Sequence, residues 1–361
     1  MASGGGLPAG SPSTGLRAAT ERRVQRLWFA PHGAADALAA LLLWPAHRLV
    51  GAIAASRRGR IARRKAVPPP AGEPKVVVVG NLTVGGTGKT PLLIALARAL
   101  VERGWRPGIV ARGYRAGGEG ETARTVVPDG TAADFGDEPL LVARRTGLPV
   151  VVGRDRGAAL ARLLADHDCD VVLSDDGLQH VGLRRDLELA VFDARGTGNG
   201  RCLPAGPLRE PLSGALLVDA LILNGAATPA PVVHSRLFRF DVVATQVVSL
   251  DGARHWTPQA FAAETRGRTL DAVAGIGAPQ RFFETLAALG IRARPHPLAD
   301  HAPIDETWLA GLPGDFVVMT EKDAVKCGTF DPLLRARCVA LRIEAVPETA
   351  LVDWLEGRLR G

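Results

Sequence analysis

The residues with the most distinctive chemistry in this chain lie in "VGNLTVGGTGKTPLLIAL", residues 79–96, where glycines, threonines and one lysine separate two apolar segments. Glycines allow backbone N–H groups to converge on phosphate oxygens, and the start of a following helix adds partial positive charge. In such a loop Lys89 reaches the β and γ phosphates and Thr90 binds Mg²⁺. We therefore predict a nucleotide-binding loop composed of Thr83, Val84, Gly85, Gly86, Thr87, Gly88, Lys89 and Thr90.

The loop departs from the strict phosphate-binding pattern at one position. That pattern has a glycine five residues before Gly88, and this chain has Thr83 there. A glycine-rich turn that binds no nucleotide is the alternative interpretation. The sequence Gly-Lys-Thr between a valine-rich strand, Val76–Val79, and an apolar helix favours the nucleotide.

A pair of acidic residues supplies a second element of phosphoryl-transfer chemistry. In "CDVVLSDDGLQH" the apolar residues Val171–Leu173 precede Asp175 and Asp176. Adjacent carboxylates repel each other unless they share a cation. We predict that one or both bind Mg²⁺ together with Thr90, and a solvated turn is the alternative.

The elements that must position these residues follow an alternating pattern. From Lys75 to Asp193, runs rich in Val, Ile and Leu alternate with helical segments, which indicates a parallel sheet covered on both faces. Prolines and alanines break the pattern at Asn224–Val233, and a second α/β unit follows. The predicted fold class is α/β: a P-loop NTPase-like core with a mainly parallel sheet at 68–228 and a smaller C-terminal α/β domain at 229–361.

The remaining residues, 1–67, are predicted to contain a disordered leader to about Leu16 and then a membrane-associated helical segment. Ala37–Ala46 carries no charge, but these ten residues fall short of the roughly 20 that span a bilayer. Six basic residues follow within Arg57–Lys65. We expect a helix lying on an anionic membrane surface, held there by all six basic residues. The alternative is a helix packed on the protein's own core with a solvated basic tail.

Composition and charge exclude several other classes. The four cysteines show no Cys-x-x-Cys spacing, so neither a zinc site nor a disulfide scaffold is predicted. The net charge of +7 is compatible with nucleic acid, but no aromatic residues are interleaved with the basic cluster. Plasmid-partition ATPases carry a lysine where this chain has Val84, and the guanine-reading pattern of GTPases is absent.

Beyond these separate motifs, the chain resembles the lipid A 4′-kinase family, the tetraacyldisaccharide 4′-kinases, over nearly its whole length. The matching stretches occur in family order: "VGNLTVGGTGKTP", "ARGY", "GDEPLLVARRTGLPVVVGRDR", "SDDGLQH", "LPAGPLREP", "GIGAPQRFF", "ADH" and "MTEKDAVKC". Thr83 agrees with this family's own version of the loop. The resemblance implies ATP-dependent phosphorylation of the 4′-hydroxyl of an acylated glucosamine disaccharide, at the cytoplasmic face of a Gram-negative inner membrane. It implies no nucleic acid and no obligate protein partner.

The resemblance also assigns roles to single residues. Asp137 in "GDEP" precedes an apolar helical run and is the implied general base, where the residues alone also allow a helix N-cap. His301 in "ADH" is the implied partner of that aspartate, and with Lys89 these complete the predicted catalytic set. Because Asp137 and His301 come from different halves, domain closure is expected.

Further polar residues have two interpretations each. Arg112 and Arg209 are candidates for binding a phosphate group or for structural ion pairs. Gln179 and His180 follow the acidic pair and either orient it or pack. A membrane-bound switch ATPase and a nucleic-acid-binding protein are the competing functions; the first predicts hydrolysis without an acceptor and the second salt-dependent DNA binding.

Overall fold

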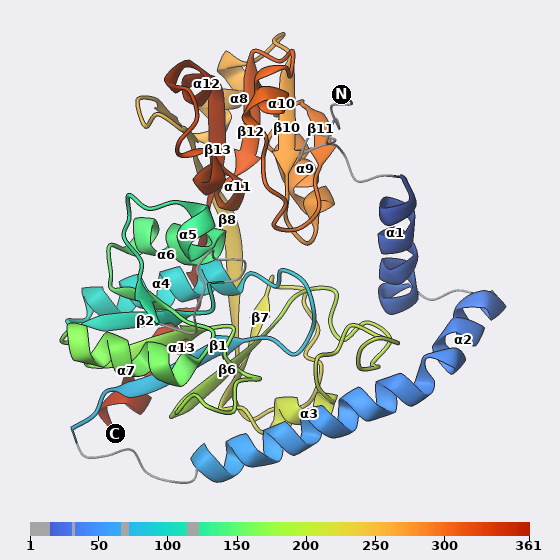
Figure 1. Cartoon of the computed structure of the whole chain (residues 1–361), viewed down its shortest axis with the longest axis vertical. Coiled ribbons are helices and arrows are strands. Elements are labelled where there is room, and N and C mark those ends of the chain that lie inside the picture. The colour runs from blue at the N-terminus through green and yellow to red at the C-terminus, as the bar shows by residue number, and fades with distance from the viewer. Residues whose placement is uncertain (1–14, 31–32, 66–71, 114–122) are drawn as a thin grey trace, which may run out of the picture.

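The computed structural model describes residues 15–30, 33–65, 72–113 and 123–361, so most of the predicted disordered leader lies outside the described residues. One β-sheet extends through two lobes (Figure 1). The first lobe contains the strands β1 (Lys75–Gly80), β2 (Pro107–Ala111), β3 (Arg124–Thr125), β4 (Val150–Val152), β5 (Val171–Asp175), β6 (Leu187–Phe192) and β7 (Ala220–Asn224). Its helices are α4 (Lys89–Glu102), α5 (Ala132–Phe135), α6 (Asp137–Thr146), α7 (Arg156–Asp166) and η1 (Leu212–Leu216).

The second lobe is smaller and mixes short strands with short helices. Its elements are β9 (His255–Trp256), α8 (Pro258–Glu264), β10 (Leu270–Ala274), α9 (Pro279–Ala288), β11 (Arg294–Pro297), α10 (Glu306–Ala310), β12 (Phe316–Thr320), α11 (Glu321–Ala324), η2 (Val325–Cys327) and α12 (Pro332–Arg337).

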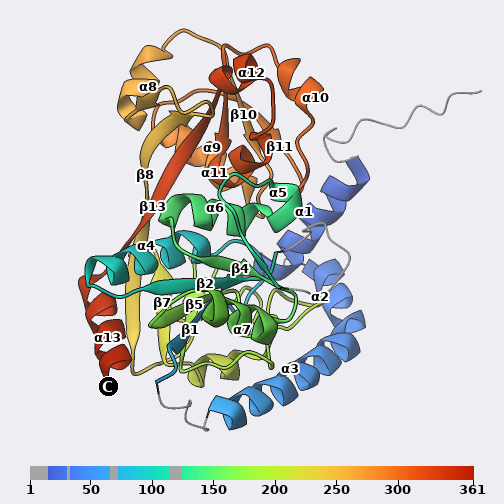
Figure 2. The ribbon, with the colours of Figure 1, turned by 60° about the vertical axis from the view of Figure 1, so that its left-hand side comes forward.

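Two long antiparallel strands, β8 (Leu237–Ser249) and β13 (Cys338–Pro347), join the lobes and run side by side between them (Figure 2). The full strand order is β11-β10-β12-β13-β8-β7-β6-β1-β5-β2-β4-β3, with β9 beside β8. Neighbouring strands are parallel except at β3–β4, β8–β9 and β8–β13. The predicted α/β class with a mainly parallel sheet is confirmed.

The valines of β1 show why the first lobe forms this sheet. Val76, Val77, Val78 and Val79 are fully buried, because helices cover both faces and β-branched side chains suit a pleated strand. On one face the core includes residues of α4 and α6. On the other face it includes residues of α7 and of the segment from Leu178 to Val218.

The last helix, α13 (Thr349–Arg360), returns to the first lobe. Its Leu351, Val352, Leu355 and Leu359 belong to the same core cluster as α4. Arg103 in the loop after α4 also forms ion pairs with Asp353 and Glu356 of α13. The predicted boundary near residue 228 falls between β7 and β8, and the division into domains there stays a prediction.

Three helices precede the sheet: α1 (Gly15–Phe29), α2 (Gly33–Leu42) and α3 (Trp44–Lys65). Toward the protein, α3 buries Gly51, Ala54, Arg58 and Ile61. Large apolar side chains of α2 and α3 are exposed by 45–72%: Leu38, Leu41, Leu42, Trp44, Leu49 and Ile53. Among the described residues no single helix is long and apolar enough to cross a membrane, whereas α2 and α3, bent by 53°, meet that criterion of length and composition together.

The basic end of α3 differs from what the sequence predicts. Arg58 is buried and binds Glu188 through two hydrogen bonds of 2.8 and 3.0 Å. Lys65 forms an ion pair with Asp219, and Arg64 donates to the carbonyl of Val181. The expectation that all six basic residues face a membrane is therefore wrong, because a carboxylate buried in β6 requires a cationic partner.

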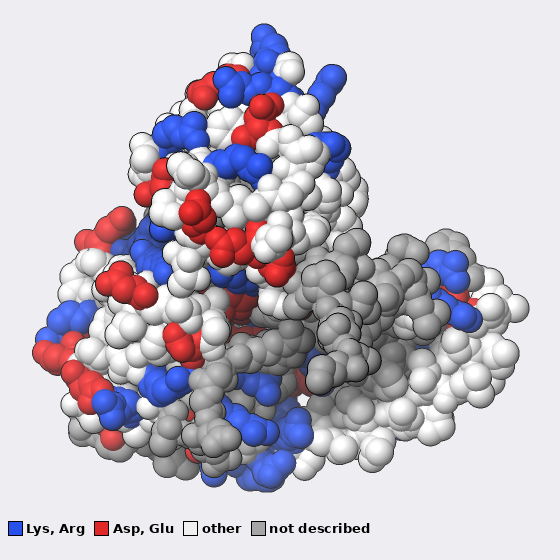
Figure 3. Space-filling model, turned by 45° about the horizontal axis from the view of Figure 1, so that its top comes forward, with Lys and Arg blue, Asp and Glu red and all other residues white. Residues whose placement is uncertain are grey.

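The other basic residues of this cluster, Arg57, Arg60 and Arg63, are exposed. In Figure 3 the arm formed by α2 and the start of α3, at lower right, carries few charges, and Lys and Arg side chains gather at the lower edge. The pair α2 and α3 is thus apolar in α2 and the first half of α3 and basic where α3 ends.

Candidate functional site

The predicted phosphate-binding loop, residues 83–90 (hereafter the P-loop), follows β1 and includes the first two residues of α4. Gly88 has φ of +88°, and a Cβ atom there would lie 2.6 Å from Nδ2 of Asn224. Only glycine tolerates both the left-handed conformation and the close contact. Pro91 falls in the first turn of α4, where its missing N–H costs no helical hydrogen bond. Gly88 and Pro91 therefore suit the turn from the loop into the N-terminus of α4.

Asp175 and Asp176 lie at the end of β5, beside the P-loop. Asp176 accepts two hydrogen bonds from Arg209, at 2.8 and 2.9 Å, and its Oδ1 lies 3.8 Å from Nζ of Lys89. Burial raises the pKa of Asp176, but Lys89 and Arg209 outweigh burial and lower it to about 2. Asp176 is therefore ionised at neutral pH.

The neighbouring Asp175 has the opposite environment. Burial, followed by repulsion from Glu138, raises its pKa to about 7 although Lys89 opposes the shift. Within the described part of the chain, its buried Oδ1 atom has no hydrogen-bond partner. An unpartnered buried carboxylate oxygen beside further acids is the environment that a divalent cation would neutralise.

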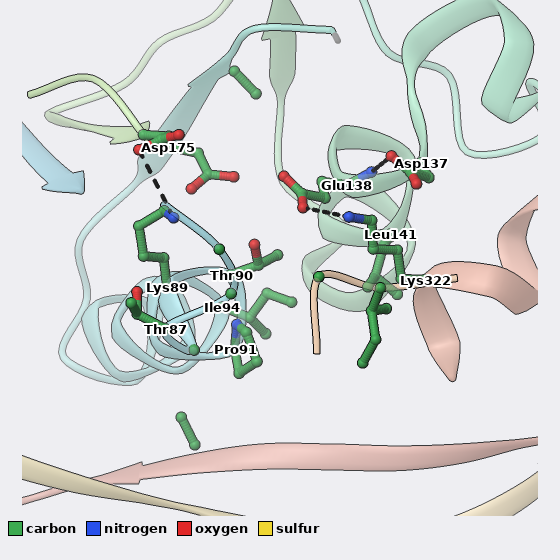
Figure 4. A pocket seen from close by; sticks show the side chains of 18 of the residues that line it. Thr87, Lys89, Thr90, Pro91, Ile94, Asp137, Glu138, Leu141, Asp175 and Lys322 are labelled. Atoms are coloured by element: carbon green, nitrogen blue, oxygen red, sulfur yellow. Dashed lines mark hydrogen bonds and ion pairs between the residues drawn. The ribbon is translucent and has the colours of Figure 1, made fainter. Parts of the chain in front are cut away.

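The residues present fit a magnesium ion of the usual P-loop kind. Among the described residues no three His, Cys, Asp or Glu side chains gather closely enough to form a metal site by themselves. Mg²⁺ is commonly bound by one or two carboxylates together with substrate phosphates and water, and does not need such a group. Figure 4 shows Asp175 and Lys89 on one side of the cavity, with Thr90 between them and Glu138.

Across the cavity, Asp137 and His301 are brought together from the two lobes. Nδ1 of His301 lies 3.0 Å from both carboxylate oxygens of Asp137. Burial raises the pKa of Asp137, but the hydrogen bond from His301 and the charges of Lys322 and Lys326 bring it below its ordinary value. Asp137 is therefore a carboxylate at neutral pH, as a base must be.

The N-cap interpretation of Asp137 is not what the structure shows. The N-cap of α6 is Gly136, and Asp137 is the first helical residue. Its Oδ1 accepts a hydrogen bond of 3.0 Å from the backbone N–H of Glu138, the next residue. Since Asp137 stands at the start of α6, its charge also gains from the helix dipole.

Lys322, from α11 of the second lobe, completes this cluster and was not predicted. Its Nζ lies 3.1 Å from Nε2 of His301 and 3.0 Å from Oε1 of Glu138. An ammonium group has only donors, so Nε2 accepts and the proton of the neutral imidazole is on Nδ1. Lys322 thus selects the tautomer in which His301 donates to Asp137.

Backbone geometry marks the same residues. Among the described residues, the non-glycine residues with positive φ are Asp176, at 50°, and His301, at 58°. Such conformations cost energy and concentrate at functional sites. Both therefore take strained conformations that direct their side chains into the cavity region.

One cavity of about 1190 Å³ between the lobes is lined by the charged and polar residues of both clusters: Lys89, Thr90, Asp137, Glu138, Asp175, Asp176, His301 and Lys322. Single-ligand pockets usually enclose about 300–1,000 Å³, so this cavity has room for a nucleotide and part of a second substrate. Arg112, Gln179, His180 and Arg209 line it as well. Arg57 of α3 also contributes, so the cavity extends from the P-loop to the N-terminal helices.

The remaining predicted residues have mixed outcomes. Gln179 donates to the carbonyl of Asn81 and to Glu210, at 3.2 and 2.8 Å, and so supports the loop instead of contacting Asp176. Burial, and then the charges of Arg156 and Arg112, lower the pKa of His180 to about 4, so that it is neutral. Arg209 forms an ion pair with the predicted metal ligand Asp176 while facing the cavity.

Sequence reasoning missed three residues that matter to this geometry: Glu138, Lys322 and Arg195. Glu138 and Lys322 lie inside the motifs "GDEP" and "TEKD", so charged residues adjoining Asp137 and following a buried strand were an available signal. Arg195 donates to the carbonyl of Gly86 at 3.0 Å. No local pattern around Arg195 indicates that contact.

Known proteins similar to this chain were found by sequence and by structure. The sequence profile of LpxK, tetraacyldisaccharide-1-P 4′-kinase, matches residues 39–360. A tetraacyldisaccharide 4′-kinase of Stutzerimonas stutzeri is 46% identical over 339 residues, covering 93% of this chain and 96% of the relative. One of Dechloromonas aromatica is 44% identical over 351 residues, covering 94% and 98%. A crystal structure of LpxK from Aquifex aeolicus in complex with ATP superimposes with a TM-score of 0.71 at 26% identity, covering 89% of this chain and 99% of that one.

Proposed function

The chain belongs to the tetraacyldisaccharide 4′-kinase family, and from that premise we propose how its residues carry out the reaction and how the protein sits on the membrane. The protein is an ATP-dependent tetraacyldisaccharide 4′-kinase of lipid A biosynthesis. In this reaction the 4′-hydroxyl oxygen of the disaccharide attacks the γ-phosphorus of ATP, the bond to the β-phosphate oxygen breaks, and ADP leaves. The hydroxyl must also lose its proton, so the site needs a base beside the acceptor as well as cations around the phosphates.

Asp137 acts as the general base that accepts the proton of the 4′-hydroxyl. The observation that supports this role best is the pair of 3.0 Å contacts between Asp137 and Nδ1 of His301. His301 orients the carboxylate, and Lys322 fixes the imidazole tautomer through its 3.1 Å contact with Nε2. A positioned base of this kind contributes about 10²–10⁴-fold to a rate.

Lys89 and the P-loop N–H groups bind the transferring phosphates. Thr90, Asp175 and Asp176 would hold Mg²⁺, with Glu138 close enough to influence the charge of Asp175. Bound Mg²⁺ would neutralise the negative charge that develops on the leaving group during phosphoryl transfer. Arg112 and Arg209 face the cavity and are candidates for binding the phosphate that the acceptor already carries.

Since Asp137 comes from the first lobe and His301 and Lys322 from the second, the catalytic group is complete only while the lobes are closed. A Cβ atom on Gly277 of the second lobe would lie 3.5 Å from the backbone N of Gly86. The turn before α9 therefore packs directly on the P-loop. We propose that β8 and β13 act as the hinge for opening.

The N-terminal segment would bring this cavity to its lipid substrate. Exposed apolar side chains on α2 and α3, followed by exposed Arg57, Arg60 and Arg63, suit the surface of an anionic bilayer. Arg57 also lines the cavity, which connects the proposed membrane face to the site. On this basis we propose that the protein works at the cytoplasmic face of the inner membrane.

Product analysis tests the reaction. Purified protein is incubated with γ-³²P-labelled ATP and the disaccharide-1-phosphate lipid, and products are separated by thin-layer chromatography. We expect label in a bisphosphorylated lipid, formed about 10²–10⁴-fold more slowly by Asp137→Ala. Release of inorganic phosphate alone, at the same rate without acceptor, would instead support a switch ATPase.

The membrane position is tested separately by flotation with phosphatidylglycerol-containing vesicles. Leu42→Asp and Leu49→Asp, in exposed positions of α2 and α3, should abolish flotation. The matched substitution Leu333→Asp, at an exposed leucine of α12, should leave flotation unchanged. Undiminished flotation of both N-terminal variants would exclude this surface.

A further inference from the structure

Three successive carbonyl groups of the P-loop each accept a hydrogen bond from a side chain outside the loop's tip. The carbonyl of Gly85 accepts from Nδ2 of Asn81 at 3.2 Å. That of Gly86 accepts from Nη2 of Arg195 at 3.0 Å, and that of Thr87 accepts from Nδ2 of Asn224 at 3.1 Å. These donors come from the end of β1, the loop after β6 and the end of β7.

The anchoring of these carbonyls determines where the adjoining N–H groups point. In a trans peptide the C=O and the following N–H point in opposite directions. The N–H groups of Gly86, Thr87 and Gly88 are therefore turned away from the three donors. None of them meets an acceptor among the described residues, and all three residues line the cavity. Within the described part of the chain, the loop thus presents three available donors to an anion without any rearrangement.

Arg195 differs from the two asparagines because it also contacts the rest of the molecule. Its Nη2 lies 3.0 Å from Asp193, a buried residue that also pairs with Arg281 of α9 at 2.7 Å. Its guanidinium carbon lies 5.3 Å from the centre of the Phe29 ring, at the end of α1. Its side chain is 16% exposed, so these partners hold it in place.

The end of α1 is itself docked on the loop that follows Arg195. The backbone N–H of Asn199 donates to the carbonyl of Trp28 at 2.7 Å, and Nε1 of Trp28 donates to the carbonyl of Pro204 at 3.0 Å. Gly198 approaches so closely that a Cβ atom there would lie 2.4 Å from the Trp28 carbonyl oxygen. A continuous set of contacts therefore leads from α1 through Arg195 to the Gly86 carbonyl.

We propose that Arg195 is a positioning residue that couples the docking of α1 to nucleotide affinity. When α1 is docked, the Phe29 ring and Asp193 hold the guanidinium against the Gly86 carbonyl, and the Thr87 N–H faces the phosphates. When α1 undocks, the guanidinium of Arg195 loses its contact with the Phe29 ring. The peptide between Gly86 and Thr87 then rotates more freely, and ATP binds more weakly. This inference rests on the proposed placement of ATP at the P-loop.

The coupling predicts a specific pattern of ATP dissociation constants. The full-length protein is titrated with ATP and Mg²⁺ in detergent solution, without acceptor, by isothermal titration calorimetry. Arg195→Ala should raise the Kd of ATP about tenfold, the size expected for losing a hydrogen bond from a charged donor. Arg195→Lys, which keeps the charge but cannot reach both Asp193 and Gly86, should raise it about threefold. Arg162→Ala, an exposed arginine of α7 paired with Asp166, is the matched control and should leave Kd unchanged.

Substitution of Phe29 tests the link to α1. Phe29→Ala should raise the Kd about threefold, and adding it to Arg195→Ala should cause no further rise, because both act through one contact. The kcat at saturating ATP should stay within about threefold of wild type in each variant. This separates positioning of the loop from loss of a catalytic group.

Two results would overturn the inference. One is an unchanged Kd of ATP in folded Arg195→Ala, whether or not its melting temperature is lowered. The other is additive effects of Phe29→Ala and Arg195→Ala on that Kd. If Arg195→Ala does not fold, Arg195→Lys and Phe29→Ala give the same comparison. Failure of the proposed kinase reaction would instead appear as normal ATP binding without lipid product, so the two failures are distinguishable.

Discussion

On the α6 side of the cavity, Asp137 is surrounded by His301, Lys322 and Lys326, whereas on the β5 side Asp175 has a buried oxygen atom without any partner among the described residues. The first carboxylate has its pKa lowered and the second has it raised to about 7. The α6 cluster is compensated by the protein's own cations and is therefore complete before substrate arrives. The β5 cluster is compensated only in part, since Lys89 and Arg209 pair with Asp176 and leave Asp175 to a ligand. In the proposed mechanism the first side of the cavity serves proton transfer, and the second binds a cation and the phosphates.

The largest expected effect comes from removing the base of the pre-organised side. Asp137→Ala should lower kcat about 10²–10⁴-fold, because the 4′-hydroxyl then lacks its positioned proton acceptor. The Kd of ATP should change less than about threefold, since Asp137 lies across the cavity from the P-loop. Steady-state kinetics and calorimetric titration measure the two quantities. A variant that binds ATP poorly and keeps its kcat would reverse the roles assigned to the two sides.

Removing the Lys89 ammonium group from the β5 side of the cavity should lower activity nearly as much, but it should also weaken ATP binding. Lys89→Ala should reduce kcat/KM for ATP about 10²–10³-fold, the usual cost of losing one donor to a transferring group. Here ATP affinity should fall as well, in contrast to Asp137→Ala. Lys75→Ala serves as a control, because this lysine donates to the carbonyl of Arg358 in α13 and not to the cavity. Equal affinity for ATP in wild type and Lys89→Ala would contradict the placement of the phosphates.

The two carboxylates, Asp175 and Asp137, should affect the folding stability in opposite directions. Above about pH 4 the unfolded chain loses a proton that the folded protein keeps on Asp175 up to about pH 7. The contribution of Asp175 to the free energy of unfolding of the ligand-free protein therefore falls as pH rises from about 4 to 7. Asp175→Asn removes that cost and should raise Tm at pH 8 by about 2–4 °C.

The corresponding change at Asp137 should have the opposite sign. The lowered pKa of Asp137 gives stability that is present above the unfolded pKa and is lost as pH falls through the folded one. Asp137→Asn should accordingly lower Tm at pH 8, by about 2–4 °C. Differential scanning calorimetry of both variants without ligand provides the test. Tm shifts of the same sign in Asp175→Asn and Asp137→Asn would show that the charges of the two carboxylates are compensated alike.

The smallest effect concerns the pH profile. Lys322 contributes to the lowered pKa of Asp137, so Lys322→Gln should raise that pKa and move the acid limb of kcat/KM to higher pH by less than about 1 unit. Lys75→Gln should not move the limb. An acid limb at the same pH in Lys322→Gln and wild type would mean that the charge of Lys322 does not act on the base.

Much of the first lobe could be predicted from the sequence because its signals are local. The valines of β1, the glycines of the P-loop and the apolar face of α4 lie within one short stretch of the chain, and short-range sterics determine their conformation. The same holds for β5 and its acidic pair. The resemblance to a family added roles that these patterns leave open.

The long strand β8 and the final helix α13 show what a sequence pattern leaves open. Both lie within the predicted unit 229–361; β8 pairs with β7 as well as with β13, and α13 packs in the same core cluster as α4. Periodicity indicates that α13 buries one face, but not which lobe supplies the partner surface.

The sequence by itself determined the chemistry available to this protein: a loop for phosphates, two acids after a strand, and an apolar segment before a basic one. Only the tertiary structure decided which charges meet. Asp137 and His301 are 164 residues apart in the chain, and Arg195 reaches Gly86 across 109 residues. Folding also turned Arg58 inward to Glu188 while leaving its neighbour Arg57 exposed. The physical reason is that local conformation depends on neighbours in sequence, whereas the pairing and burial of charges depend on neighbours in space.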